Sequence, residues 1–99
     1  MEVAAGASIV APAVIGEGTR VAAGAVVGAR AVVGRHCRIG AGARVSEAVL
    51  WERVTLGERA VVAGGVLADD VAVGARATVG EGVVLERGAV VAEGATLPR

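Results

Sequence analysis

An aliphatic residue returns at every sixth position along most of the chain, and we call these residues the anchors. From the N-terminus they are Val3, Ile9, Ile15, Val21, Val27, Val33, Ile39 and Val45. The spacing shortens to five residues twice, and the later anchors are Leu50, Leu56, Val62, Leu67, Val73, Val79, Leu85, Val91 and Leu97. Because every anchor is Val, Ile or Leu, the pattern predicts one buried aliphatic position in each repeat unit.

Small residues such as Ala25 and Ala31 stand four positions after most anchors, and many of the chain's 16 glycines lie between the two sets. An α-helix would need apolar residues three and four apart, and it would not tolerate so many glycines. Antiparallel strands would alternate over longer runs. The pattern therefore predicts short strands with one inward anchor, joined by tight turns with one small inward residue.

Three such units close a triangular coil, and stacked coils pair each strand in parallel with its equivalent about 4.8 Å away. We therefore predict an all-β fold, a parallel β-helix of about five triangular coils at that spacing, with residues 1–99 forming a single domain. The anchors fill the interior of the prism, and the small residues fit its corners.

The two shortened units, residues 45–49 and 62–66, lie 17 residues apart, which is one coil of six, six and five. They are therefore predicted to stack on one corner, with Ala48 and Gly65 as the small inward residues. This register places one outward residue of each coil in an unbroken column of valines. Its members are Val14, Val32, Val49, Val66 and Val84.

The valine column favours an interface, because a continuous apolar stripe is unusual on the surface of so small a protein. The equivalent columns of the other two faces are mixed in character. Trp51, the only aromatic residue, falls beside the column between Gly34 and Ala68, which we expect to leave room for the indole. The alternative is that the valines serve strand propensity alone.

The segment IGEGTRVAAGAVVGARAVVGRHCRIGAGARV resembles the hexapeptide repeat of left-handed parallel β-helices. The resemblance covers essentially the whole chain. It implies a left-handed coil, which runs against the usual crossover rule. It does not decide function, because acyltransferases, γ-class carbonic anhydrases and sugar nucleotidyltransferases share the fold.

A second resemblance is narrower. VGRHCRIGAGARVSEAVLWERVTLGERAVV resembles the C-terminal β-helix of mannose-1-phosphate guanylyltransferases and related NDP-sugar pyrophosphorylases, in which a Ser-Val-Leu-Trp-like stretch interrupts the repeats. This resemblance implies a non-catalytic role in oligomerisation or regulation beside a nucleotidyltransferase catalytic domain. We expect a homo-oligomer built on the valine column. Many free-standing members of the hexapeptide-repeat fold are trimers, whereas nucleotidyltransferase β-helices often pair differently, so we expect a trimer slightly ahead of a dimer.

Candidate chemistry is sparse, and we assign no catalytic, cofactor-binding or metal-binding residue. Acyltransferases of this fold use a histidine as general base, which makes His36 a weak candidate. Those enzymes carry an excursion loop, whereas every departure from the repeat here is a deletion. A γ-class zinc site needs three histidines, and the chain has one. Cys37 is expected to pack inward like an alanine.

Five charged residues are expected to form a solvated ladder at one corner of the prism. They are Glu17, Arg35, Glu52, Asp69 and Arg87.

The composition limits the classes of binding partner that we expect. The formal net charge is zero, so no long-range attraction to nucleic acid or to a membrane is expected. A single cysteine gives no disulfide, and we expect a cytoplasmic protein. The absence of Asn and Gln fits a thermophile, whereas the absence of Lys points instead to GC-rich coding.

Two alternatives to the nucleotidyltransferase interpretation stay open. One is a small acyltransferase-like enzyme with His36 as its base. The other is a scaffold that assembles through the exposed strand edges at the ends of the rod. Pro98 would blunt one of those ends.

Overall fold

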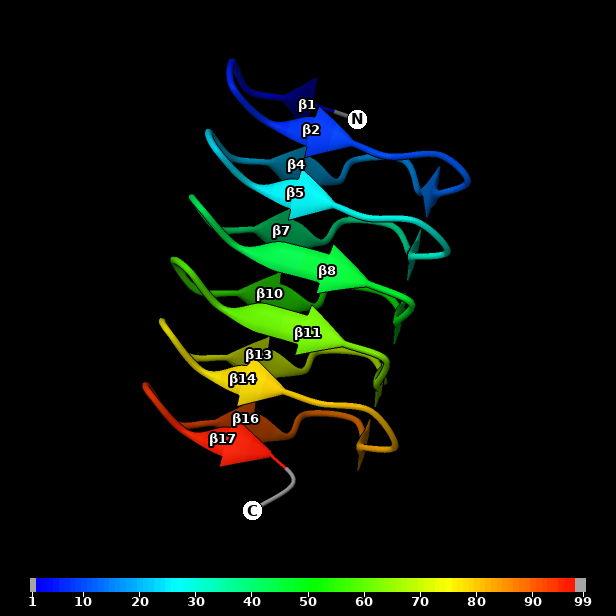
Figure 1. The fold of residues 1–99 in the computed structure, drawn as a ribbon. Coiled ribbons are helices and arrows are strands. Elements are labelled where there is room, and N and C mark those ends of the chain that lie inside the picture. Colours follow the sequence, from blue (N-terminus) through cyan, green and yellow to red (C-terminus); the bar gives the residue numbers. More distant parts are fainter. Residues whose placement is uncertain (1, 98–99) are drawn as a thin grey trace.

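The computed structural model describes residues 2–97, which form short strands and turns stacked into a three-sided rod (Figure 1). The molecule measures 32 × 20 × 19 Å along its principal axes. Among these residues, no helix is long and apolar enough to cross a membrane.

Every strand pairs in parallel with its equivalent in each adjacent coil, and the first and last strand of each sheet have one such partner. Sheet 1 contains β1 (Glu2–Val3), β4 (Arg20–Val21), β7 (Arg38–Ile39), β10 (Thr55–Leu56), β13 (Ala72–Val73) and β16 (Val90–Val91). Sheet 2 contains β2 (Ser8–Ile9), β5 (Val26–Val27), β8 (Arg44–Ser46), β11 (Val61–Ala63), β14 (Thr78–Val79) and β17 (Thr96–Leu97). Sheet 3 contains β3 (Val14–Ile15), β6 (Val32–Val33), β9 (Val49–Leu50), β12 (Val66–Leu67) and β15 (Val84–Leu85).

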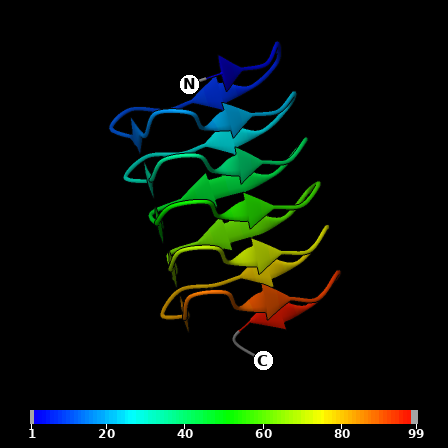
Figure 2. The same cartoon turned by 180° about the vertical axis from the view of Figure 1, so that it is seen from behind.

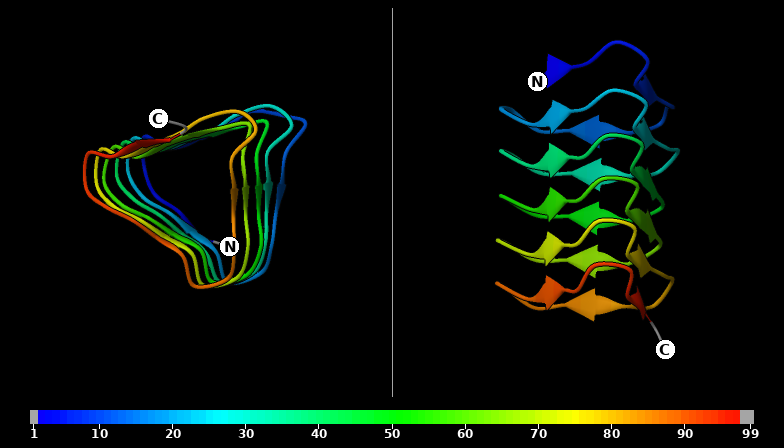
Figure 3. Two further views of the ribbon diagram at one scale, coloured as in Figure 1. Left: turned by 90° about the horizontal axis from the view of Figure 1, so that it is seen from below. Right: turned by 90° about the vertical axis from the view of Figure 1, so that its left-hand side faces the viewer.

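The sheets of six, six and five strands make five complete coils and two further strands, as the spacing predicted. Seen along the rod axis, the coils superpose as a triangle (Figure 3). In that view the chain runs clockwise as it approaches the viewer, so the coil is left-handed. The predicted left-handed parallel β-helix is confirmed.

The core is built from the anchors and the small corner residues. In the middle coils, Val27, Val62 and Leu67 are fully buried, and so are the corner residues Ala25 and Ala60. Small aliphatic side chains suffice because the prism is narrow, which explains why the chain needs no aromatic residue inside. The end coils are less covered, and Val3 and Ile9 are about two-fifths exposed.

Every turn except the one between β2 and β3 is closed by one residue with a left-handed backbone conformation. Glycine fills this position in the outer coils, whereas non-glycine residues such as His36 (φ 58°) and Arg53 (φ 58°) fill many of the central turns. Left-handed backbone is unfavourable for residues with a Cβ, at about 1–2 kcal/mol each. Because cross-coil hydrogen bonds hold these turns, as from the His36 amide to the Glu17 carbonyl at 3.0 Å, the packed stack maintains that conformation.

The two deletions shorten stacked turns between sheets 2 and 3, as predicted. In these coils β8 and β11 each gain a third residue, and Ser46 pairs with Ala63. The turn then contains two residues instead of the four found in every other connection between the strands of residues 2–97. Ala48 and Gly65 are buried as the small inward residues. The shortened corner is visible on the two green coils of Figure 2, where the turn is tighter than in the blue and orange coils.

Register on sheet 3 is preserved by these deletions. Val14 pairs with Val32, Val32 with Val49, Val49 with Val66, and Val66 with Val84. The predicted valine column is therefore present from β3 to β15. Pro98, which was expected to blunt one end of the rod, lies outside the described residues.

Candidate functional site

The valine column lies on the outer face of sheet 3. Val14, Val32 and Val84 are 61%, 41% and 69% exposed, and Val49 and Val66 are partly buried. The column faces solvent because each member precedes an inward anchor, and successive residues of a strand point to opposite faces. Sheets 1 and 2 carry charged or hydroxyl side chains at equivalent positions, such as Arg38 and Arg44. Sheet 3 alone carries an aliphatic residue at the outward position of every one of its strands.

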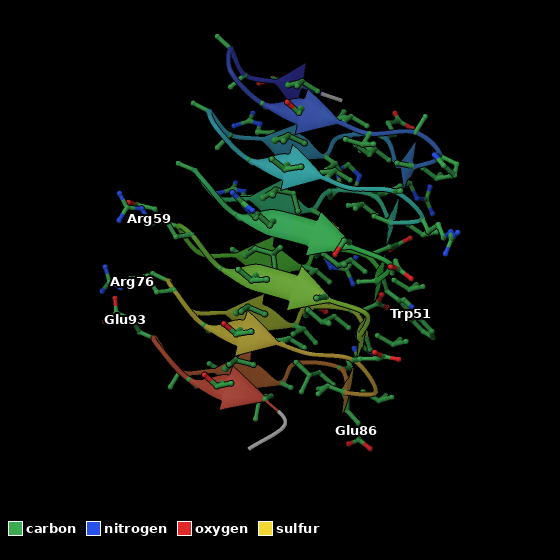
Figure 4. All side chains as sticks on the ribbon, in the orientation of Figure 1. Trp51, Arg59, Arg76, Glu86 and Glu93 are labelled. Atoms are coloured by element: carbon green, nitrogen blue, oxygen red, sulfur yellow. The ribbon has the colours of Figure 1, made fainter. Side chains whose placement is uncertain are left out.

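Trp51 follows β9 and extends the apolar surface of the valine column to the next corner. Its side chain points away from the rod (Figure 4) and is 52% exposed. A Cβ on Gly34 would collide with the backbone carbonyl of Trp51. The reason for this glycine is therefore close approach of two backbones, and not only room for the indole as the sequence suggested.

Cys37 fixes the carbonyl of Trp51 from inside the corner. The thiol is fully buried and donates a hydrogen bond to the Trp51 oxygen at 3.0 Å. Burial raises the pKa of this thiol above its ordinary value, although hydrogen bonds with neighbouring groups such as the Val54 backbone oppose the rise. The prediction that Cys37 packs inward is confirmed, but the thiol also hydrogen-bonds in a way that an alanine cannot.

Thr19 braces the same corner from the preceding coil. Its hydroxyl donates to the Gly34 carbonyl at 2.7 Å and accepts from the Cys37 amide at 3.1 Å. Thr19 is fully buried, and this pairing satisfies both capacities of its hydroxyl. The corner beside Trp51 is therefore held by a short chain of buried polar groups. One sign of this chain of polar groups can be read in the sequence, since Thr19 and Cys37 stand at inward corner positions that elsewhere carry Ala, Val or Gly.

A charged ladder covers the outside of this same corner. Arg35 pairs with Glu52 at 2.9 Å, and Arg53 pairs with Asp70 at 2.8 Å and with Glu52 at 3.2 Å. The hydrogen bond from Arg53 lowers the pKa of Asp70 below its ordinary value. The predicted ladder was a single column, whereas these pairs also use the neighbouring column.

His36 is exposed at the third position of a four-residue turn. Its imidazole lies against Gly18 of the preceding coil, where a Cβ would meet the ring. Connections of four or two residues leave no long loop within residues 2–97 that could cover a cleft beside it. Among those residues, no group of three His, Cys, Asp or Glu side chains could hold a metal ion.

A family model for the EIF2B subunit epsilon LbH domain matches residues 1–97. The chain belongs to this LbH domain family. The hexapeptide-repeat resemblance seen in the sequence is therefore confirmed, and the match fits the narrower resemblance to nucleotidyltransferase C-terminal β-helices. A search of curated proteins found no match.

Several solved structures share the LbH fold. One is a mutant of AntD, an N-acyltransferase from Bacillus cereus in complex with dTDP and coenzyme A. It is 17% identical, with a TM-score of 0.90, and the match covers 95% of this chain and 68% of that one. At this identity the likeness concerns the fold alone.

Two further structures are more similar in sequence. The acetyltransferase domain of PglB from Neisseria gonorrhoeae is 25% identical, with a TM-score of 0.64, and the match covers 91% of this chain and 53% of that one. PerB from Caulobacter crescentus, in complex with coenzyme A and GDP-perosamine, is 27% identical with a TM-score of 0.51, and the coverage is 92% and 52%. The LbH chain thus spans about half the length of each of these two proteins.

Proposed function

We propose that this LbH chain is a non-catalytic oligomerisation or regulatory β-helix of a sugar-phosphate nucleotidyltransferase-like protein. In this proposal the valine column and Trp51 form the contact with further copies of the chain, as a trimer ahead of a dimer. The catalytic domain of such a protein would be its functional partner, and the assembly would be cytoplasmic.

The observation that carries the proposal is the register of the valine column. Two separate deletions leave Val49 and Val66 aligned with Val32 and Val84, so the apolar stripe is continuous across five coils. Covering such a stripe is favourable by roughly 25 cal/mol for each Å² of apolar surface removed from water. The adjacent indole adds a large flat side chain of the kind enriched in interfaces.

The proposal that the chain does no chemistry of its own rests on the geometry around its candidate groups. His36 lies on an exposed turn, and connections of at most four residues leave it open to solvent. A general base must lie within hydrogen-bond reach of the proton that it abstracts, so it needs a substrate held against it. The buried Cys37 thiol is committed to the Trp51 carbonyl.

The interface is tested by charge substitutions on different faces. Val32→Glu and Trp51→Glu each place a carboxylate in the proposed contact, where burial without a partner is costly. Light scattering should show both variants dissociating while the β-rich circular dichroism persists. The matched control is Val90→Glu on sheet 1, which changes a 77% exposed valine at the equivalent position and should leave the assembly intact. A wild-type chain that is monomeric at high concentration would contradict the interface.

The non-catalytic role is tested by incubating the chain with GTP, mannose 1-phosphate and Mg²⁺. We expect no release of pyrophosphate above background. Clear turnover by a clean preparation would contradict the proposal, since synthesis of a sugar nucleotide requires a site that binds both the triphosphate and its metal ion.

A second candidate function is acyl transfer, which is favoured by the likeness to PglB and PerB. In this alternative His36 acts as the general base in a cleft completed by another subunit. The test is transfer from acetyl-coenzyme A to amine or hydroxyl acceptors, with His36→Ala as the comparison. Acyl transfer that depends on His36 would support this function and displace the non-catalytic proposal.

A further inference from the structure

The outer face of sheet 1 places two arginines side by side. Arg20 of β4 and Arg38 of β7 are direct partners in the parallel ladder. Their strands are therefore about 4.8 Å apart. Like charges at directly opposite positions of a sheet destabilise it, because the guanidinium groups repel one another. Both side chains are exposed, so solvent screens part of this repulsion, and an anion bound between them would remove it.

Several other arginines of residues 2–97 avoid that problem by facing a carboxylate one coil away. Arg35 pairs with Glu52, and Arg76 pairs with Glu93 at 3.0 Å, a pair visible at the left of Figure 4. The Nε atom of Arg20 is 3.9 Å from a carboxylate oxygen of Glu2, which is at the outer limit of an ion pair. Arg38 has no carboxylate of residues 2–97 within 4.0 Å, because its other ladder partner is Thr55.

These two arginines border a groove of about 670 Å³ on sheet 1. The groove runs across the first four strands of the sheet, and small outward residues, among them Ala22 and Gly40, line it. Large side chains are excluded at Gly40 because a Cβ there would lie 2.7 Å from the backbone of the next coil. Its volume is in the range of small-molecule sites.

We propose that this groove binds the diphosphate group of a small molecule, held between Arg20 and Arg38. A guanidinium donates two parallel hydrogen bonds to phosphate oxygens, and two guanidiniums on successive strands suit two linked phosphates. Bound anion would also relieve the repulsion between the two arginines. Glu2 repels a ligand at the N-terminal end, so the diphosphate lies toward Arg38. The groove is on sheet 1, so it remains open when the valine column of sheet 3 is covered.

Calorimetric titration at low salt tests the site with inorganic pyrophosphate, ADP and adenosine as probes. Pyrophosphate and ADP should both bind, with affinity that falls as salt is added, and adenosine should not. Tighter binding of ADP would identify a nucleoside diphosphate as the source of the group. Equal binding would identify free diphosphate, and either result supports the site.

Arg38→Gln should weaken pyrophosphate binding about tenfold or more, because one charge-assisted contact of the pair is lost. The matched control is Arg44→Gln on sheet 2. Arg44 is exposed and faces Val26 and Val61 in its ladder, so the control removes the same charge outside the groove. The affinity of the Arg44→Gln variant for pyrophosphate should stay within about twofold of wild type. Circular dichroism confirms that both variants fold.

Three results would overturn the site. The first is a wild type that fails to bind pyrophosphate at millimolar concentration. The second is an equal loss in the Arg38→Gln and Arg44→Gln variants, because it would mean diffuse attraction to net charge. The third is binding of adenosine as strong as that of ADP, since the phosphates would then contribute nothing.

Discussion

Sheets 1 and 3 both have aliphatic residues on the inner surface, but they differ in the polarity of the outer surface. The inward residues of β7 and β6 are Ile39 and Val33, and each is at most 2% exposed. In front of them stand Arg38 on one sheet and Val32 on the other. The comparison shows that the inward positions of this repeat specify the prism, whereas the outward positions can carry either aliphatic or charged side chains.

The corners of the two sheets differ as well. Sheet 3 is entered through the two shortened turns, and it leads into the corner that Thr19 and Cys37 brace from inside. The corner after sheet 1 is lined by alanines such as Ala25 and Ala43, which bring no polar side-chain atoms. The apolar face is therefore attached to a more constrained corner, which suits the proposed contact with another copy.

The largest effect on the free energy of unfolding should come from a substitution at an inward position of sheet 3, compared with one at the neighbouring outward position of the same strand. Leu67→Ala removes a fully buried anchor and should cost about 2–5 kcal/mol of unfolding free energy. The neighbouring Val66→Ala, on the outer face, should cost about 1 kcal/mol or less. Urea unfolding of both variants at one protein concentration measures the difference. Equal losses would show that inner and outer columns are not independent.

The corner glycines give the next largest effect. Gly34→Ala forces the new methyl group against the Trp51 carbonyl and should cost about 1–3 kcal/mol. Gly28 occupies the equivalent position after an anchor on sheet 2, where a Cβ would lie 3.1 Å from its nearest neighbour. Gly28→Ala should therefore be milder. Thermal unfolding followed by Trp51 fluorescence compares the two, and a harsher effect at Gly28 would contradict the close backbone approach at Trp51.

Cys37 should make stability depend on alkaline pH. Its pKa is raised in the folded protein, so the unfolded thiol ionises first as the pH rises past about 9. Ionisation then favours the unfolded chain, and the stabilisation present below that pH is lost. Cys37→Ala should lose about 1 kcal/mol at neutral pH with the hydrogen bond to Trp51, and its alkaline decline should be shallower. Unfolding curves of both proteins between neutral and alkaline pH test this, and parallel declines would exclude the thiol as their cause.

The smallest effect is expected at the ladder outside the same corner. The pKa of Asp70 is lowered by Arg53, so the folded carboxylate contributes stability above its unfolded pKa, near 4. That contribution disappears as the pH falls through the lower folded value. Asp70→Asn removes it at every pH, and the two proteins should converge in acid. Melting curves across the acid range measure the difference, which should be small because both groups are solvent-exposed.

Much of the candidate site could be predicted because the repeat assigns each residue a face. The valine column and the position of Trp51 followed from the anchors and the two deletions alone. The six-residue repeat also puts Arg20 and Arg38 in one column of sheet 1, but whether their charges are neutralised depends on whether a carboxylate lies within reach. Long charged side chains adopt many conformations, so the position of Arg53 in its column did not predict which carboxylates it pairs with.

The sequence by itself determined the triangular coils, because a period of six with Val, Ile or Leu at each anchor buries all of the anchors inside a three-sided prism. The left hand of the coil followed from the resemblance to hexapeptide repeats and not from the spacing. The sequence also determined which residues share a face. The tertiary structure decided what those residues touch. Only the stacked coils bring the Trp51 carbonyl against Gly34 and within reach of the Cys37 thiol, and only they leave the groove beside Arg38 open. Such contacts join residues 14 to 18 positions apart, and their distances depend on how closely neighbouring coils approach.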